Sequence, residues 1–191
     1  MDFHDSELAR LRAGDVGALE SCYRVFGRRV RRLCRSLLGP NDADDATQEV
    51  FVRVFERARQ FSGRARFSTW IYRLTVNHCL HRLERERRRG AEPLSDENGS
   101  SWERALSWTD DALRAVDDRD AVEKLLGELN PEQRTALTLR EIEGLDYREI
   151  ADVLDVPIGT VMSRLNRARQ RLIELADASR AHASWHRIST P

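Results

Sequence analysis

The chain has 191 residues, 32 Lys plus Arg against 32 Asp plus Glu, and 40% hydrophobic residues. This length corresponds to one or two small domains. The sequence contains no run of about 18 consecutive apolar residues, which excludes a membrane-spanning helix. Residues 1–12 lack the basic start and apolar middle of a secretory signal. We therefore expect a cytoplasmic protein that does not insert into a membrane.

The net charge of zero conceals a strong segregation of charge along the chain. Residues 28–90 hold sixteen Arg and seven acids, residues 91–120 hold nine acids and three Arg, and residues 157–173 hold four Arg and no acid. Of the 32 basic residues, 31 are Arg, whose planar guanidinium suits bidentate phosphate contacts. The two basic segments predict contacts to nucleic acid, although the overall composition does not.

Apolar residues recur at helical spacing almost throughout, and no β-branched alternation is bounded by turns, so we predict an all-α protein. Residues 6–38 predict two helical segments, with a break near Gly14 and a possible second one near Gly27. Their expected inward face comprises Leu8, Leu11, Leu19, Tyr23, Val30, Leu33 and Leu37.

The turn at residues 39–42 predicts the end of one helix and the cap of the next, which runs to about residue 60. Its apolar face is expected at Ala46, Val50, Phe51, Val54 and Phe55. A loop of aromatic and basic residues follows at 61–67. Ser68 or Thr69 then caps a long helix from Trp70 to about Arg89.

Residues 90–118 combine Gly, Pro and Ser with many acids, which predicts a flexible acidic linker. Trp102 and Trp108 interrupt it, and we expect these large apolar side chains to dock on a domain or on a partner. A second helical domain begins near residue 117. Its helix after Asn130-Pro131 has a strong start signal and is expected to end at Gly144.

The motif at residues 146–171 decides the functional interpretation. Asp146 and Glu149 form a capping box that begins a short helix. A turn at residues 155–159 leads into a second helix, expected to reach Leu175, that carries four arginines. This arrangement predicts a helix-turn-helix whose second helix reads DNA. The alternative is a helical hairpin with a solvated arginine face.

Two sets of motifs resemble the extracytoplasmic-function (ECF) sigma factors of bacterial RNA polymerase over roughly residues 17–175. DADDATQEVF at 42–51 resembles the region 2 helix that docks on the β′ clamp helices of the polymerase. FSTWIYRLTVN at 67–77 resembles the segment that opens and reads the −10 promoter element. EGLDYREIA at 143–151 and PIGTVMSRLNRAR at 157–169 resemble region 4, which reads the −35 element.

The resemblance implies two small helical domains, a region 2 bundle at residues 1–90 and a region 4 helix-turn-helix at residues 119–176. The acidic linker at 91–118 joins them, and residues 177–191 form a C-terminal tail. The implied partners are core RNA polymerase, through its β′ clamp helices and β flap, and promoter DNA. An anti-sigma factor is a further expected partner.

The matching positions divide into three sets of expected binding residues. Single-stranded DNA needs cations for its phosphates and aromatic faces for its bases, which the second set supplies. The polymerase-binding set is Asp44, Asp45, Gln48, Glu49 and Phe51. The −10 set is Arg64, Arg66, Phe67, Trp70, Tyr72, Arg73 and Asn77. The −35 set, within or next to the helix-turn-helix from Tyr147 to Asn166, is Arg148, Thr160, Ser163, Arg164, Arg167 and Arg169.

Met162 departs from the family pattern, which commonly has Arg or Lys at this position, so one −35 contact is expected to be absent or replaced by an apolar contact. Two other classes of protein were weighed. A two-domain helix-turn-helix regulator that is not a polymerase subunit leaves the Trp70 segment and the acidic helix unexplained. An enzyme such as a recombinase needs a catalytic domain that an all-α N-terminal half does not indicate.

The remaining chemistry-bearing residues predict no cofactor, metal, small-molecule substrate or enzymatic activity. His78 and His81 share a helix face, but Cys79 points away and no fourth ligand is visible. No glycine-rich phosphate loop or nucleophile elbow is present. The cysteines, Cys22, Cys34 and Cys79, are odd in number and widely spaced, which predicts reduced, buried thiols.

Overall fold

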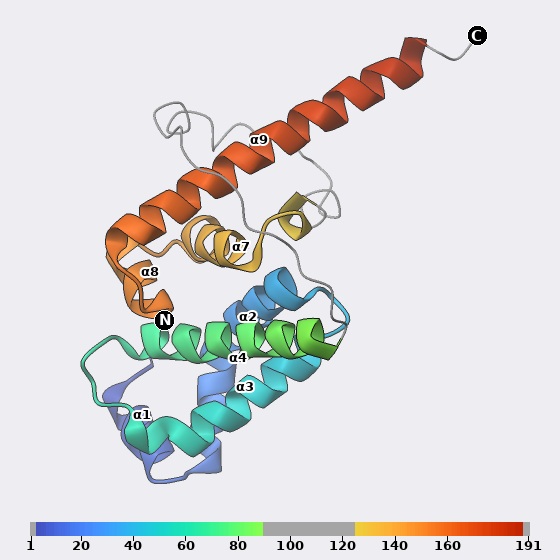
Figure 1. The fold of residues 1–191 in the computed structure, drawn as a ribbon. Helices are drawn as coiled ribbons and strands as arrows, with labels where there is room; N and C mark the ends of the chain where they lie inside the picture. Colours follow the sequence, from blue (N-terminus) through green and yellow to red (C-terminus); the bar gives the residue numbers. More distant parts are fainter. Residues whose placement is uncertain (1–2, 90–124, 189–191) are drawn as a thin grey trace.

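The computed structural model describes residues 3–89 and 125–188, and every regular element within these residues is helical (Figure 1). The predicted all-α fold is confirmed. The N-terminal half contains α1 (Asp5–Arg12), α2 (Val16–Leu38), α3 (Ala43–Arg57), the short 3₁₀ helix η1 (Ala58–Gln60) and α4 (Phe67–Arg89). The C-terminal half contains α7 (Pro131–Leu137), the π-helix η2 (Thr138–Ile142), α8 (Tyr147–Leu154) and α9 (Ile158–Ile188). No helix among the described residues is long and apolar enough to cross a membrane.

The predicted break between the first two helices lies at Gly14, whose φ of 86° is in the left-handed region. Asp15 then caps α2, because its carboxylate accepts hydrogen bonds from the backbone N–H groups of Gly17 and Ala18. The possible break at Gly27 is wrong. Gly27 is buried inside α2, and an added Cβ would lie 3.3 Å from the ring of Tyr23.

The starts of α3 and α4 differ from their predicted caps. Asp42 precedes α3, but its side chain makes no capping bond and is instead bound by Arg82 of α4. The backbone N–H of Trp70 donates to the carbonyl of Arg66 at 3.1 Å, so α4 already begins at Phe67. Ser68 and Thr69 therefore lie inside the helix. The helix is extended because the Phe67 ring packs among other aromatic rings.

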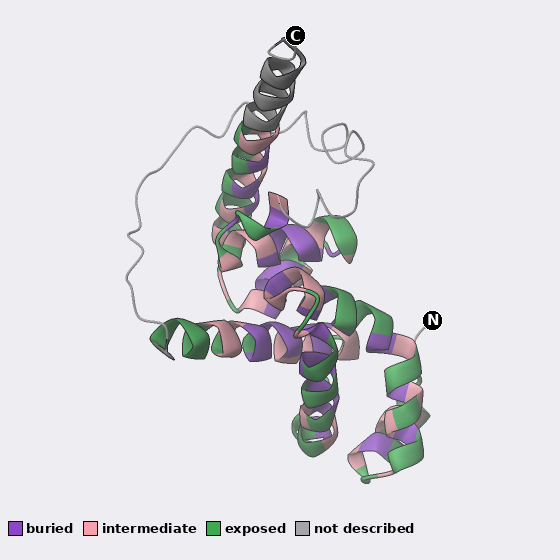
Figure 2. Ribbon diagram, turned by 90° about the vertical axis from the view of Figure 1, so that its right-hand side faces the viewer, coloured by how far each residue is buried: buried purple, intermediate pink, exposed green. Residues whose placement is uncertain are grey.

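Helices α2, α3 and α4 pack together around the core of the first domain. Its largest fully buried side chains include Leu33, Val50, Val54 and Ile71. Figure 2 shows buried positions on the inward faces of these helices and exposed positions on their outer faces. Tyr23 does not belong to the inward face predicted for it, since it is 48% exposed.

All three cysteines are free and buried, as predicted. The Sγ atoms of Cys34 in α2 and Cys79 in α4 lie 3.8 Å apart. Burial raises the pKa of the Cys22 thiol to about 12, so this thiol is uncharged and packs as a small apolar group.

The second domain begins with the predicted cap, because the Asn130 side chain accepts a hydrogen bond from the backbone N–H of Gln133 at 2.9 Å. The helix does not continue regularly to Gly144. It widens into the π-helix η2, and the backbone N–H of Leu145 donates to the carbonyl of Leu139 at 3.0 Å. Gly144 has a φ of 70° and completes the turn.

The helix-turn-helix is formed as predicted. The backbone N–H of Glu149 donates to Asp146 Oδ1 at 2.8 Å, and that of Asp146 donates to Glu149 Oε2 at 3.0 Å, which completes the capping box. Asp155 ends α8 with a φ of 56°. The inner face of α9 is buried at Val161, Leu165, Ala168 and Leu172. Helix α9 continues to Ile188, beyond the predicted end at Leu175.

The two domains are packed against each other rather than separated (Figure 1). Helix α8 lies against α4, and α7 and η2 lie against α2. The buried apolar side chains of both domains form one contiguous cluster. The predictions for the acidic linker and for Trp102 and Trp108 lie outside the described residues.

Candidate nucleic-acid interface

Aromatic rings gather beside the loop that connects η1 to α4. The Phe67 ring stacks on Trp70, with centroids 5.4 Å apart and planes 22° apart, and on Phe3 at 5.1 Å and 20°. Phe61 and Phe26 meet the Phe67 ring edge-on at 5.2 and 5.9 Å. Gly63 gives the loop its turn, with a φ of 76°. This geometry forms one wall of a cleft of about 870 Å³.

The N-terminal helix holds the start of this loop in place. Arg12 donates a hydrogen bond to the carbonyl of Phe61, and its guanidinium carbon lies 5.4 Å from the centre of the Phe61 ring. Arg59 Nε donates in turn to the carbonyl of Arg12 at 3.1 Å. The sequence interpretation missed Phe3 and Arg12, because neither lies in the motifs that resemble region 2. Phe26 was detectable only as an apolar position at helical spacing.

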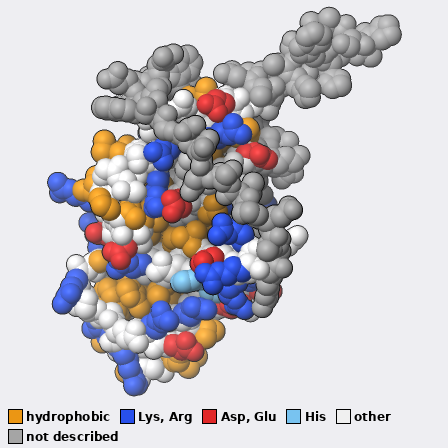
Figure 3. All heavy atoms as spheres, viewed as in Figure 1, with side chains coloured by type: hydrophobic (Ala, Val, Ile, Leu, Met, Phe, Trp, Pro, Cys, Tyr) orange, Lys and Arg blue, Asp and Glu red, His pale blue; other side chains and the backbone are white. Residues whose placement is uncertain are grey.

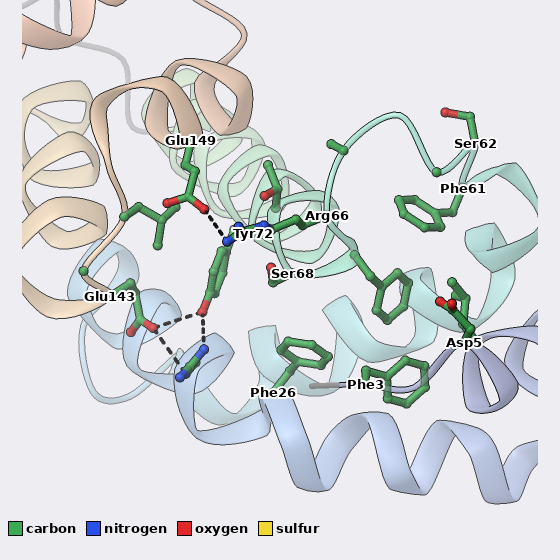
Figure 4. A pocket seen from close by; sticks show the side chains of 18 of the residues that line it. Phe3, Asp5, Phe26, Phe61, Ser62, Arg66, Ser68, Tyr72, Glu143 and Glu149 are labelled. Atoms are coloured by element: carbon green, nitrogen blue, oxygen red, sulfur yellow. Dashed lines mark hydrogen bonds and ion pairs between the residues drawn. The ribbon is translucent and has the colours of Figure 1, made fainter. Parts of the chain in front are cut away.

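Two basic members of the −10 set, Arg66 and Arg73, contact the second domain. Arg66 Nη1 lies 3.1 Å from Glu149 Oε1, and Arg73 Nη2 lies 2.7 Å from Asp155 Oδ1. Figure 4 shows Arg66 reaching Glu149 across the cleft. Arg64 and Asn77 are exposed. The structure thus places Arg66 in the same cleft as Phe67 and Tyr72, whereas Asn77 lies further along α4.

Tyr72 and Glu143 meet at the centre of the contact between the domains. The Tyr72 hydroxyl donates to Glu143 Oε2 at 3.2 Å (Figure 4). Burial, followed by the nearby Glu143 carboxylate, raises the pKa of Tyr72 to about 12. Tyr72 is therefore a protonated donor, and only 2% of the residue is exposed.

Glu143 is the most deeply enclosed charged group of this contact, with 1% of its side chain exposed. Its carboxylate oxygens lie 3.6 Å from Arg32 Nε and 4.0 Å from Arg29 Nε. Burial raises the pKa of the Glu143 carboxyl, and Arg32, Tyr72 and Arg29 offset this only in part. The sequence interpretation assigned no role to Arg29 or Arg32. Their spacing of three residues on one helix was the available signal.

Four members of the polymerase-binding set lie on the exposed face of α3. Asp44, Asp45, Gln48 and Glu49 are exposed, whereas Phe51 is buried at 4% exposure and packs against Tyr23. Arg31 binds Asp44 and holds the pKa of that carboxyl below its usual value. The same surface exposes Val52 at 55%. The side chains of Tyr23 and Val52 thus add an apolar part to the acidic face, which the sequence interpretation did not include.

The arginines of the helix-turn-helix differ in how exposed they are and in whether they form ion pairs. Arg167 and, on α8, Arg148 are exposed. The side chain of Arg164 is 18% exposed and lies 2.7 Å from Glu132, and that of Arg169 is 13% exposed and lies 2.8 Å from Glu141. Ser163 is exposed and donates to the carbonyl of Thr160. Met162 is 52% exposed on the same helix.

Basic and acidic side chains are interspersed on the face seen in Figure 3. The molecule offers two candidate surfaces for nucleic acid. One is the aromatic side of the cleft, which the first domain supplies and which Glu143 and Glu149 of the second domain face. The other is the helix-turn-helix of the second domain.

Both halves match known families. Residues 22–89 match the family described as Sigma-70 region 2, and residues 119–172 match Sigma-70, region 4. The RNA polymerase sigma-H factor of Pseudomonas aeruginosa is 35% identical over 167 residues, which cover 84% of each chain. The ECF RNA polymerase sigma-E factor of Escherichia coli is 31% identical over 172 residues, 85% of this chain and 88% of the relative.

Two solved structures resemble the whole arrangement. CnrH, solved in complex with the cytosolic domain of CnrY, has a TM-score of 0.67 and 25% identity and is matched over 93% of this chain and 99% of its own. The sigma factor RpoE of Bartonella quintana, solved with the anti-sigma factor NepR, has a TM-score of 0.62 and 22% identity. The match covers 83% of this chain and 96% of that chain and shows the likeness of the fold.

The fold and the two surfaces define a two-domain transcription factor of the sigma class. The chain belongs to the ECF sigma factors, so it is an alternative initiation factor that acts with RNA polymerase on promoter DNA. The resemblance read from its motifs is confirmed. A helix-turn-helix regulator that acts without the polymerase is not favoured, because the relatives match over both domains.

Proposed function

We propose that residues 1–90 bind core polymerase and read the −10 element, and that residues 119–176 read the −35 element, with 91–118 as the linker and 177–191 as the tail. The observation that carries the first assignment is the cleft in which Arg66 lies beside the aromatic side chains of Phe61, Phe67 and Tyr72. Cations attract phosphates, and aromatic faces stack unpaired bases. Asn77, exposed on α4, is suited to hydrogen-bond a base edge.

The −35 element is read by the exposed part of the helix-turn-helix. Arg148, Ser163 and Arg167 are exposed, and the N-terminal part of a recognition helix is where base edges are met. Thr160 contributes a hydroxyl at the same end. Arg164 and Arg169 keep their ion pairs within the domain and present the remaining guanidinium donors to the DNA backbone. Met162 supplies an apolar contact in place of a cation.

The acidic face of α3 binds the β′ clamp helices of core polymerase, and region 4 binds the β flap. Asp44, Asp45, Gln48 and Glu49 pair with basic groups of the partner, which favours fast and specific association. Phe51 acts from below this face by supporting Tyr23. The similarity to the sigma factor RpoE, solved with the anti-sigma factor NepR, supports an anti-sigma factor as a partner of this protein. The protein acts in the cytoplasm and has no enzymatic activity of its own.

The division of labour can be tested by transcription in vitro. The protein is mixed with core polymerase and a promoter library, and initiation from a subset is expected. Asn77→Ala is expected to impair open-complex formation and to leave duplex binding near normal, whereas Arg167→Ala weakens duplex −35 binding. Gln170→Ala, an exposed change on the same helix as Arg167, is the control. Failure to bind core polymerase, or to initiate transcription at any promoter, would contradict the proposal.

A further inference from the structure

Carboxylates of the second domain lie on arginines of the first domain, two of which, Arg66 and Arg73, are assigned to −10 DNA. Glu149 is bound to Arg66, Asp155 to Arg73, and Glu143 to Arg29 and Arg32. We propose that the helix-turn-helix domain is an internal competitor of −10 DNA, in which these acids occupy the positions of DNA phosphates. The inference rests on the proposed −10 function of the first domain.

The contact extends beyond the ion pairs, which makes it a defined interface. The Ser36 hydroxyl of α2 and the Thr138 hydroxyl of η2 lie 2.6 Å apart, and Thr138 is fully buried. The Tyr72 hydroxyl is engaged by Glu143. Tyr72 is thereby covered although it belongs to the −10 set, and it becomes available to a base only when the second domain moves away.

Two of these acids lie at the ends of α8, within the helix-turn-helix itself. Glu149 is held by the capping box, and Asp155 lies at the left-handed end of α8. Both positions follow from the turns of the helix-turn-helix itself. The acidic edge is therefore built into the same motif that reads the −35 element, so binding at one DNA site and closure over the other are linked.

The outer ion pairs are suited to reversible closure. The side chain of Arg66 is 80% exposed, and that of Asp155 is 85% exposed. Exposed pairs contribute little and are screened by salt. A DNA strand, which presents several phosphates and bases at once, can displace them. The free protein is thus closed, and the −10 surface opens when the second domain is drawn away.

A covalent lock tests the closure directly. In the double variant Ser36→Cys/Thr138→Cys the two sulfurs replace hydroxyl oxygens 2.6 Å apart, near the disulfide bond length of about 2.05 Å. After oxidation with diamide, binding of a fluorescent random-sequence 15-nucleotide single strand, a length of roughly one binding site, is expected to be lost and to return with dithiothreitol. Wild type and Ser36→Cys, treated identically, control for the native cysteines.

Charge reversal tests the opening. Glu143→Lys places a cation against Arg29 and Arg32 and is expected to separate the domains and to raise binding of the same single strand by about fivefold or more, the lower range of allosteric coupling. Asp152→Lys makes the same charge change on exposed α8, where Asp152 has no ion-pair partner among the described residues, and is expected to have a much smaller effect. Thermal melting checks that both variants are folded.

A measurement of the distance between the domains tests closure independently of the proposed −10 function. Fluorescent labels on α3 and α9 report closure without DNA. Labels that are no further apart in Glu143→Lys than in wild type, or a lock that never forms, would overturn the closed state. Opening without any gain in single-strand binding would overturn the competition and count against the −10 assignment, while closure itself would stand.

Discussion

The two arginine-rich surfaces are balanced by acids in different ways. On the recognition helix, Arg164 and Arg169 pair with Glu132 and Glu141 of the same domain. On the −10 surface, Arg66 and Arg73 pair with Glu149 and Asp155 of the other domain. A pair within a domain persists in every arrangement of the domains and orients a side chain. A pair between domains exists only while the domains are packed together, so its presence indicates the closed arrangement.

The largest expected effect comes from breaking one domain while sparing the other. Leu165 is 1% exposed in the core of the helix-turn-helix, and Leu165→Ala is expected to cost about 2–5 kcal/mol of folding free energy. The variant should lose −35 duplex binding and gain single-strand binding, because the unfolded domain no longer covers the −10 surface. Urea denaturation with both binding assays measures this. Loss of both duplex binding and single-strand binding would contradict the idea that the second domain covers the −10 surface.

The second prediction concerns the two kinds of arginine on α9. Arg167→Ala removes an exposed cation and is expected to weaken −35 binding by about 1–3 kcal/mol if it reads a base, or to lower the salt slope by about one if it binds a phosphate. Arg169→Ala should weaken binding less and destabilise the domain more, because Arg169 also holds Glu141. Titrations at several salt concentrations, with melting curves, distinguish the two. Equal effects of the two substitutions on binding and on stability would contradict the distinction between exposed and ion-paired arginines.

Arg12 gives a smaller effect within the first domain. Arg12→Ala removes the hydrogen bond to the Phe61 carbonyl and the stacking on its ring, a contact of about 1 kcal/mol. We expect reduced discrimination between promoters that differ in one −10 base, with duplex −35 binding unchanged. Arg10→Ala, in the same helix but paired with Asp15, is the control. Equal loss of transcription from all promoters would indicate a purely structural role.

The smallest expected effect is a pH dependence of closure. Burial raises the pKa of Glu143 in the closed state, so closure is accompanied by proton uptake and becomes more favourable as the pH falls through this raised pKa. Tyr72, with a pKa of about 12, stays neutral over the same range. Domain distance should therefore shorten from about pH 7.5 to about pH 5, approaching the usual carboxylate range.

Glu143→Gln is the matched control for this dependence. It imitates the protonated carboxyl and is expected to stay closed and to lose the pH response, whereas Glu143→Lys opens the molecule. A pH response that survives in Glu143→Gln would show that Glu143 is not its source.

The sequence alone determined the features that depend on neighbouring residues. The capping box of Asp146 and Glu149, the cap at Asn130 and the break at Gly14 were all predictable, because each is a hydrogen bond or a backbone conformation within a few residues. The family also followed from two motif sets in the correct order. The exact start of α4 did not, because aromatic packing with Phe3 and Phe61 decides it.

Only the tertiary structure decided which charges meet. Glu143 appears in sequence as one acid among many, and its contacts with Arg29, Arg32 and Tyr72 join residues more than 70 positions apart. The spacing of apolar residues likewise did not predict the π-helix at 138–142, which ends beside Glu143. Coulomb interactions depend on distance in space rather than along the chain. The zero net charge of the sequence therefore became informative only when the fold showed acids of one domain lying on arginines of the other.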